Sequence, residues 1–345
     1  KLTMIIDDYS NINKLITDNS YSSVFLLLDN NTENHCLDLF IKKSGIVNFN
    51  KVVVNDGEES KSIDTCEDVW EYLNTNNADR KSLLINIGGG VITDLGGFIA
   101  STYLRGIDFI NVPTTVLCMV DAAYGGKTGI NFKSIKNQIG VINKPKGILI
   151  DIDFLKTLSQ EEYINGFAEI YKHSLITDNE KLQFKNLVKF DFNNDIKDII
   201  HSYSSIKNKV VELDLYESNY RKVLNLGHTI GHAVESYSIL SKETNKLKHG
   251  EAIAVGLITE LYISHKIHGF DYKNLLSIKK ELLGNFKKIS FTTSNQKEIF
   301  IIMSYDKKNY NNKVKYVLLK GIGNPIIDQD VDNELFFKAF DFYNE

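Results

Sequence analysis

The chain has 345 residues, enough for two domains of ordinary size, and 43% of them are hydrophobic. A formal charge of −4 with no large basic block argues against nucleic-acid binding, and no apolar run approaches the roughly 18 residues of a membrane span. Cys36, Cys66 and Cys118 form no C-x-x-C pair, so neither a thiolate zinc site nor a disulfide framework is indicated. Residues 1–8 carry two acids and no long apolar run, unlike a signal peptide, so we expect a soluble cytoplasmic protein.

Short apolar runs alternate with amphipathic stretches over residues 1–153. Several runs are apolar on both faces, as in a parallel sheet that is covered by helices on both sides. Helical patterns such as Cys66–Asn74 lie between them, and this rhythm predicts an α/β, Rossmann-like domain. The predicted strands are Val24–Leu28, Val52–Val54, Leu83–Ile87, Phe109–Val112 and Ile148–Ile150.

The pattern changes near Phe154, and we place a domain boundary at about residue 153. Long helical stretches follow, and one late segment, Lys315–Leu319, has the pattern of a strand. Residues 154–345 are therefore predicted to form a second, mainly α-helical domain. The predicted helices are Gln160–Leu175, Ile196–Leu213, His228–Tyr237 and Glu251–His268.

A glycine loop, Gly88-Gly89-Gly90, follows the strand Leu83–Ile87 and precedes the helical stretch Val91–Ala100. Glycines let the backbone approach a diphosphate, and the helix N-terminus offers free N–H groups. The loop does not fit G-x-G-x-x-G, because Thr93 stands at the third glycine, so a plain tight turn remains an alternative. Asp94 in the first helical turn is favoured by the helix dipole, but it is also explained as a helix-start residue.

His228 and His232 are four residues apart, so on a helix they share one face. His249 opens a second helix, and Glu169 lies in another helical stretch. Two imidazoles and one carboxylate with an open fourth position make a catalytic zinc site. Glycines next to the three histidines would let other groups approach closely. From spacing alone, a metal site and ordinary buried or surface histidines remain alternatives.

Several cations stand beside glycines or beside the candidate metal ligands, which would suit a substrate with phosphate and carboxylate groups. They are Arg105, Lys127, Lys136, Lys172, Lys207, Arg221 and Lys307. Gly125-Gly-Lys-Thr is no P-loop, because Asp121 occupies the place of its first glycine. Scattered solvated charge remains the plain explanation for most of the lysines and arginines.

Together, these segments resemble the 3-dehydroquinate synthase family from about Asp29 to Gly323. The motifs that carry the resemblance occur in the family's order. They are Gly88-Gly-Gly-Val-Ile-Thr-Asp94, Tyr103-Leu-Arg-Gly106, Pro113-Thr-Thr115, Val120-Asp-Ala122, Gly125-Gly-Lys-Thr-Gly129, Lys136-Asn137, Gly166-Phe-Ala-Glu169 with Lys172, Arg221 to His232, and His249-Gly-Glu251. Two places depart from the family pattern, Ala123-Tyr124 and Cys118-Met119, and Tyr124 is the larger change because it lies near Lys127 in sequence.

The resemblance implies a set of roles for individual residues. Zinc, or cobalt in its place, would bind Glu169, His228 and His249. NAD would bind Gly89, Gly90, Asp94, Thr114 and Thr115, with Asp29, Asn31, Glu58 and Lys61 at its adenosine end and Thr157, Leu158 and Glu162 at the nicotinamide side. The substrate phosphate would bind Lys127, Asn137, His232 and Lys307, and Arg105 from a neighbouring subunit of a homodimer, and Lys136 would also bind the substrate. The substrate carboxylate would bind Lys207, Arg221 and Asn225, and the ring hydroxyls would contact Asp121, Lys172 and Glu217.

The activity that the resemblance implies is a lyase reaction of the shikimate pathway. It converts 3-deoxy-D-arabino-heptulosonate 7-phosphate to 3-dehydroquinate and phosphate by transient oxidation with NAD, elimination, reduction, ring opening and an intramolecular aldol step. One alternative is another sugar phosphate cyclase, which would have no use for the carboxylate set Lys207, Arg221 and Asn225. Others are a metal-dependent alcohol dehydrogenase, which would release NADH, and an interaction module that kept the fold.

Overall fold

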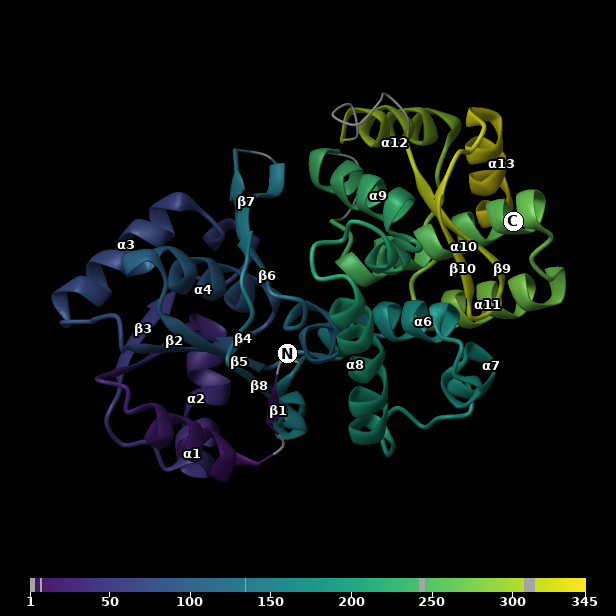
Figure 1. Cartoon of the computed structure of the whole chain (residues 1–345). Helices are drawn as coiled ribbons and strands as arrows, with labels where there is room; N and C mark the ends of the chain where they lie inside the picture. Colours follow the sequence, from purple (N-terminus) through teal and green to yellow (C-terminus); the bar gives the residue numbers. More distant parts are fainter. Residues whose placement is uncertain (1–3, 7, 134, 242–245, 307–313) are drawn as a thin grey trace. The chain divides into compact units, whose positions relative to one another are not determined.

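The computed structural model describes residues 4–6, 8–133, 135–241, 246–306 and 314–345 (Figure 1). The chain divides into two compact units, each described here by itself. Unit 1 comprises residues 1–163 and 207–212, and unit 2 comprises residues 164–206 and 213–345. None of the helices in the described ranges combines the length and the apolar character that a membrane span requires.

Unit 1 is built on a six-stranded parallel sheet with the strand order β1-β8-β5-β4-β2-β3. Two of the inner strands, β2 and β4, are almost wholly apolar, because helices cover both faces of the sheet. The strands are β1 (Met4–Ile6), β2 (Val24–Asp29), β3 (Asn50–Val54), β4 (Leu83–Gly88), β5 (Asp108–Pro113) and β8 (Gly147–Leu149). All five strands predicted from the sequence are present, whereas the three-residue edge strand β1 was not predicted.

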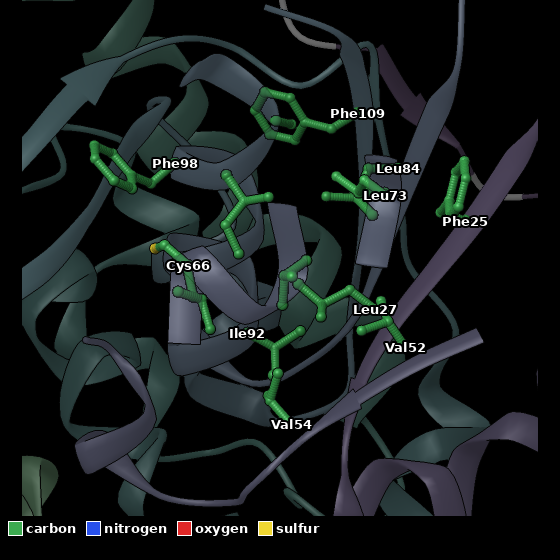
Figure 2. Packing of buried hydrophobic residues seen from close by; sticks show 14 of the residues in the cluster. Phe25, Leu27, Val52, Val54, Cys66, Leu73, Leu84, Ile92, Phe98 and Phe109 are labelled. Atoms are coloured by element: carbon green, nitrogen blue, oxygen red, sulfur yellow. The ribbon is translucent and has the colours of Figure 1, made fainter. Parts of the chain in front are cut away.

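Helices α3 and α4 lie on one face of this sheet, and α1 and α2 lie on the other (Figure 1). Figure 2 shows the core on the first face, where Phe25 and Leu27 of β2 pack near Leu73 of α3 and Ile92 of α4. Helices α1, α2 and α3 begin after the N-cap residues Asp8, Asp29 and Ser62, whose side chains accept hydrogen bonds from backbone N–H groups. Their bounds are α1 (Tyr9–Asn19), α2 (Asn30–Ser44), α3 (Ile63–Thr75) and α4 (Gly90–Thr102).

An antiparallel hairpin, β6 (Lys127–Phe132) and β7 (Ile135–Ile142), packs on α4 and was not predicted. Gly97 of α4 allows this contact, since a Cβ there would lie 2.4 Å from Thr128 Cγ2. Short helical segments connect the elements of unit 1. They are η1 (Glu58–Ser60), η2 (Tyr103–Arg105), η3 (Cys118–Ala122), η4 (Ile152–Thr157) and the first part of α5 (Gln160–Asn165).

Unit 2 is mainly helical and is organised around α10 (His249–His268), which is buried along most of its length. Helix α10 contacts α6, α9, α11, α13 and β9, so it is apolar on most faces, as a central helix must be. Helix α8 (Ile196–Leu213) is shared, since its residues 207–212 belong to unit 1. The other helical elements of unit 2 are α6 (Phe167–Ile176), η5 (Glu180–Leu182), α7 (Phe184–Leu187), η6 (Tyr220–Asn225), α9 (His228–Leu240), α11 (Tyr272–Asn285), α12 (Thr293–Asp306) and α13 (Asn333–Asn344).

Two sequence predictions for this half need correction. The single late strand is part of a hairpin, because β9 (Tyr316–Gly321) pairs with β10 (Asn324–Gln329). Strand β10 was missed because it begins with an exposed Asn followed by Pro and lacks a clear apolar run. The predicted helix Gln160–Leu175 is two helices, α5 and α6, divided at Gly166. The fold class itself, an α/β half followed by a mainly helical half, is confirmed.

Candidate functional site

The residues predicted to bind NAD follow the carboxyl ends of five parallel strands of unit 1. Asp29 ends β2, Glu58 and Lys61 follow β3, Gly89 and Gly90 follow β4, Thr114 and Thr115 follow β5, and Thr157, Leu158 and Glu162 follow β8. From β2 the chain passes outward to β3, whereas from β4 it passes to β5 in the opposite direction. The carboxyl ends of β2 and β4 therefore flank a topological switch point, the place where parallel α/β sheets bind ligands.

The glycine loop at this edge leads directly from β4 into α4. Gly89 is the N-cap of α4 and has no side chain to cap it, so the first N–H groups of this thirteen-residue helix face the loop. A Cβ on Gly88 would lie 2.5 Å from the Ile92 Cβ, and one on Gly89 would lie 3.3 Å from the Thr115 Cγ2. The close packing of the loop against α4 and Thr115 therefore requires glycine. Because these glycines have no side chains, the loop backbone is not covered by side chains of the loop itself.

Three predicted ligand-binding residues, Glu58, Asp94 and Asn137, meet at the ammonium of a fourth, Lys61, whose side chain is 3% exposed. Its Nζ lies 2.9 Å from Asp94 Oδ2 and 3.6 Å from Glu58 Oε1, and it also contacts the amide oxygen of Asn137 on β7. Burial alone would lower the pKa of Lys61, but Asp94 and Glu58 outweigh it and raise that pKa. Lys61 therefore stays charged and holds the adenosine-end residues and the phosphate-binding candidate Asn137 in one network.

Asp121 and Lys207, assigned by resemblance to ring hydroxyls and to the carboxylate, form an ion pair of 2.6 Å within unit 1. Asp121 lies on η3, a single π-helical turn, which is a geometry that is frequent at functional sites. Arg105, Asn137 and Glu217 have left-handed backbones, with φ of 67°, 53° and 57°. Such backbones are uncommon outside glycine and cluster at binding and catalytic sites, which supports a functional interpretation of all three.

In unit 2, Glu169, His228 and His249 converge on one point. The Glu169 Oε1 atom lies 3.3 Å from His228 Nε2 and 3.2 Å from His249 Nε2. Ligands bound at 2.0–2.1 Å around a tetrahedral zinc ion lie about 3.3 Å from one another, so the two measured separations fit a common ion. His232 lies beside them, its ring 5.0 Å from that of His228, and the three imidazoles could also group around a cation.

Outer hydrogen bonds fix both imidazoles with Nε2 toward Glu169. His228 Nδ1 lies 3.1 Å from the Leu226 carbonyl oxygen, and His249 Nδ1 lies 3.1 Å from Glu235 Oε2. A carbonyl can only accept, so His228 donates from Nδ1, and its neutral ring presents the Nε2 lone pair to an acidic oxygen. Two acceptors facing each other call for a cation between them, and a carbonyl or carboxylate behind each histidine is the usual support of a metal ligand.

The charges around this cluster favour an ionised carboxylate. Burial alone would raise the pKa of Glu169, but the Lys172 ammonium and the imidazoles outweigh it and hold that pKa well below its usual range. Burial and Lys172 lower the pKa of His228 despite Glu169. Burial alone would also lower the pKa of His249, but hydrogen bonds to Glu169 and Glu235 raise it to about 9. His249 therefore holds a proton at the position where a metal would bind.

Two of the three residues predicted for the substrate carboxylate, Arg221 and Asn225, lie on η6 of unit 2. Arg221 is 2% exposed, and its Nη1 donates to the Leu215 carbonyl oxygen at 2.6 Å. Asn225 Nδ2 donates to Glu217 Oε1 at 2.7 Å. Glu217 and Asn225 also line a cavity of about 330 Å³, together with Lys222, Thr229, Lys315, Tyr316, Val317 and Asp328.

For the other predicted residues, the structure gives a local contact or the exposure of the side chain. The Oδ1 atom of Asp29 caps α2 by accepting from Thr32 N–H at 2.7 Å. Arg105, Asn31, Lys127, Lys136 and Thr157 are exposed, whereas Leu158 and Glu162 are half-buried and Thr114 is buried. Lys307 lies outside the described residues. Tyr124, the main departure from the family pattern, is fully buried.

Sequence reasoning missed several residues that hold these sites. Glu235 supports His249, Asn165 Oδ1 accepts from Gly250 N–H at 2.5 Å at the start of α10, and Asn131 Nδ2 donates to Glu58 Oε1 at 2.9 Å. Glu235 could have been found, because it is three residues after His232 on one helix and presents a carboxylate toward the same region. Asn165 and Asn131 carry no such signal, since each acts on an element distant in sequence.

The two-part architecture defines a class of protein by its fold, which is that of the sugar phosphate cyclases. A 2-deoxy-scyllo-inosose synthase complexed with carbaglucose-6-phosphate, NAD+ and Co2+ superimposes with a TM-score of 0.82 at 22% identity, covering 98% of this chain and 95% of the other. A 2-epi-5-epi-valiolone synthase from Streptomyces hygroscopicus with NAD+ and Zn2+ bound gives 0.83 at 21% identity, covering 99% and 96%. At these identities the likeness shows the fold.

The sequence comparisons identify the family. Residues 51–165 match the N-terminal model and residues 166–309 the C-terminal model of 3-dehydroquinate synthase. A 3-dehydroquinate synthase of Parabacteroides distasonis is 36% identical over 347 aligned residues, covering 100% of this chain and 98% of the relative. The chain belongs to the 3-dehydroquinate synthase family.

Proposed function

We propose that this chain is a lyase that converts 3-deoxy-D-arabino-heptulosonate 7-phosphate to 3-dehydroquinate and phosphate. The observation that carries the proposal is the convergence of Glu169, His228 and His249 on one point, in a chain that matches a 3-dehydroquinate synthase over its full length. The likeness to other cyclases is weaker, since it rests on fold alone. The buried Arg221 on η6 further favours a substrate that carries a carboxylate.

The cofactors we propose are NAD, at the carboxyl edge of the unit 1 sheet, and zinc or cobalt, at the unit 2 cluster. The fit of NAD rests on the uncapped α4 start at a switch point, and the fit of the metal rests on two supported imidazoles facing a carboxylate. When bound, they supply reversible hydride exchange and polarisation of the substrate hydroxyls. Residues 1–153 are accordingly the NAD-binding part, and residues 154–345 are the metal- and substrate-binding part.

The chain's own residues bind, orient and carry protons. Arg221 with Asn225 and Lys207 holds the carboxylate, and Lys127, Lys136, Asn137 and Lys307 hold the phosphate. Asp121, Glu217 and Lys172 contact the hydroxyls. His232 moves or positions a proton near the leaving phosphate. Because Asp121 pairs with Lys207 and Glu217 with Asn225 in this structure, each substrate group replaces or joins an existing partner.

The direct test is phosphate release from the seven-carbon substrate, with and without EDTA, while NADH absorbance is followed. We expect stoichiometric phosphate and 3-dehydroquinate, loss of activity with EDTA and recovery with zinc, and no net NADH. Accumulating NADH would favour an alcohol dehydrogenase. Turnover of a sugar phosphate without a carboxylate, but not of the acid, would favour another cyclase. No turnover of either would contradict the enzymatic proposal.

We further propose a cytoplasmic homodimer in which Arg105 acts on the phosphate bound by the neighbouring subunit. Support comes from its exposed side chain and from its left-handed backbone at the end of η2, just before β5. A C2 dimer would place two such arginines reciprocally, and a fixed cation would stabilise the leaving phosphate.

The dimer can be tested by mixing inactive subunits. Arg105→Ala and His228→Ala subunits should each be nearly inactive, and a mixed dimer has one pocket with both defects and one with neither. Activity should return to about one intact site per mixed dimer. Confirmed subunit exchange without recovered activity would show that Arg105 acts within its own chain.

A further inference from the structure

The start of helix α9 has an unusual arrangement. The helix begins at His228, directly after Gly227, which has a left-handed φ of 77° and no side chain to cap the helix. A Cβ on Gly227 would lie 2.7 Å from the Leu257 Cδ2, and one on Gly256 would lie 1.8 Å from the Gly227 carbonyl oxygen. The backbones of α9 and α10 are thus in direct contact, and a capping side chain at position 227 has no room.

The carboxylate of Glu260, in the middle of α10, takes over this task. Its Oε2 accepts from the Gly227 N–H at 2.7 Å, and its Oε1 accepts from the Ile230 N–H at 3.0 Å. Glu260 is fully buried, and a carboxylate at the start of a helix is favoured by the helix dipole. The two amides bracket His228 in the sequence, so one side chain holds both ends of the turn that carries it.

The bond to Gly227 also reaches the imidazole of His228. The Gly227 N–H and the Leu226 carbonyl belong to one planar peptide unit, so fixing the N–H fixes the carbonyl. That carbonyl accepts from His228 Nδ1 at 3.1 Å and thereby orients the ring toward Glu169. An ionised acceptor polarises the peptide, which strengthens its carbonyl as an acceptor in turn.

We propose that Glu260 is a positioning residue for His228: it replaces the missing N-cap of α9 and sets the orientation and tautomer of this metal-binding imidazole. Because α10 also begins with His249, the same carboxylate ties the two histidine-bearing helices together. The inference rests on the proposed metal site, but the hydrogen bonds from Gly227 and Ile230 can be measured in metal-free protein.

The test is Glu260→Gln, which keeps the shape but offers one acceptor oxygen in place of two. In metal-free wild type, the Gly227 and Ile230 amides should be strongly protected from hydrogen exchange, and ¹⁵N shifts should show His228 protonated at Nδ1. The variant should lose protection at one or both amides and show mixed tautomers. By chelator competition, zinc should bind about 10- to 100-fold more weakly, with an altered visible spectrum when cobalt is bound.

Ser264→Ala is the matched control. Ser264 is buried on the same helix, and its Oγ donates to the Glu260 carbonyl and accepts from Leu319 N–H, away from α9. It should lower the free energy of unfolding and leave zinc affinity unchanged.

Three results would overturn the proposal. They are unprotected Gly227 and Ile230 amides in wild type, zinc affinity in Glu260→Gln within twofold of wild type, or an equal loss of zinc affinity in Ser264→Ala. If Glu260→Gln fails to fold, the wild-type amide and tautomer measurements still decide. If wild type binds no zinc, the proposed function fails, and the His228 tautomer decides the role of Glu260 separately.

Discussion

The two halves of the molecule organise their charged groups in different ways. In unit 2, the Nε2 atoms of two imidazoles face one oxygen of the Glu169 carboxylate, and each imidazole is hydrogen-bonded from behind, His228 to the Leu226 carbonyl and His249 to Glu235. In unit 1, opposite charges are already paired, since Lys61 contacts Asp94 and Glu58 and Lys207 contacts Asp121.

The difference means that the two units are arranged for their ligands in different ways before binding. In unit 2, the atoms proposed to bind a metal already face one another, and a proton on His249 together with the Lys172 ammonium balances Glu169 until a metal displaces that proton. Paired charges are stable without ligand, so unit 1 must exchange its own contacts for contacts with NAD and substrate. The predictions below test this contrast, from the largest expected effect to the smallest.

Removing a metal ligand should have the largest effect. His249→Ala deletes one of the converging donors, and we expect zinc binding to be lost and phosphate release to fall by about 10³-fold or more. The measurements are zinc content after dialysis and turnover with added zinc. His268→Ala, at the other end of α10 where its side chain bonds Gln329, should keep both zinc and activity. Full zinc occupancy in His249→Ala would contradict the assignment.

Arg221→Ala should weaken substrate binding by about 10- to 100-fold and leave NAD binding nearly unchanged. The physical reason is the loss of a charge-assisted hydrogen bond to the carboxylate, which is worth about 1.5–3 kcal/mol. Calorimetric titration of the variant with a substrate analogue and with NAD measures both affinities. Because Arg221 is buried, the melting temperature of Arg221→Ala must be compared with that of Lys222→Ala, a variant of its half-buried neighbour. Equal losses for both ligands would exclude the carboxylate role.

Lys61→Met should destabilise unit 1 by about 2–3 kcal/mol, because Asp94 and Glu58 lose the buried cation between them. Urea unfolding followed by Trp70, the single tryptophan, reports on unit 1 because it lies on α3. Lys51→Met, which removes an exposed ion pair with Glu33, should cost less than about 1 kcal/mol. Zinc affinity should not change. A weaker zinc site in Lys61→Met would show that the two halves are not prepared independently.

Asp153→Asn should have the smallest effect, about 0.2–1 kcal/mol, since this carboxylate is one-third exposed. Hydrogen bonds from Lys156 and Lys43 lower the pKa of Asp153 to about 2. A carboxylate whose pKa is lower in the folded state contributes its full stabilisation of the fold above the unfolded-state pKa of about 3.9. That contribution shrinks as the pH falls toward 2. The wild type and the variant should therefore differ at pH 7 and converge as the pH falls toward 2. The exposed Asp18→Asn should show no such convergence.

Local sequence pattern accounted for much of the architecture. The strands Leu83–Ile87 and Phe109–Val112 were predicted within one residue at each end, because strands covered on both faces are continuous apolar runs with clear ends. The hairpin β6–β7 escaped prediction because most of its residues are exposed, including the apolar Phe132, Ile135, Ile139 and Val141, although Ile130 packs into the core. Gly166 divides a helical pattern that looks continuous when the residue types alone are considered.

The sequence by itself determined the family, the two-part organisation and the candidate metal ligands, because ordered motifs and helical spacing are properties of the chain. The i, i+4 spacing placed His228 and His232 on one helix face, but it could not show that Glu169, about sixty residues earlier, faces the Nε2 of His228. Glu260 carried no signal at all, since a glutamate in an apolar helix becomes meaningful only when the N–H groups of another helix reach it. Such groups are chosen by the tertiary structure, because a buried polar group must find its partner in space and not along the chain.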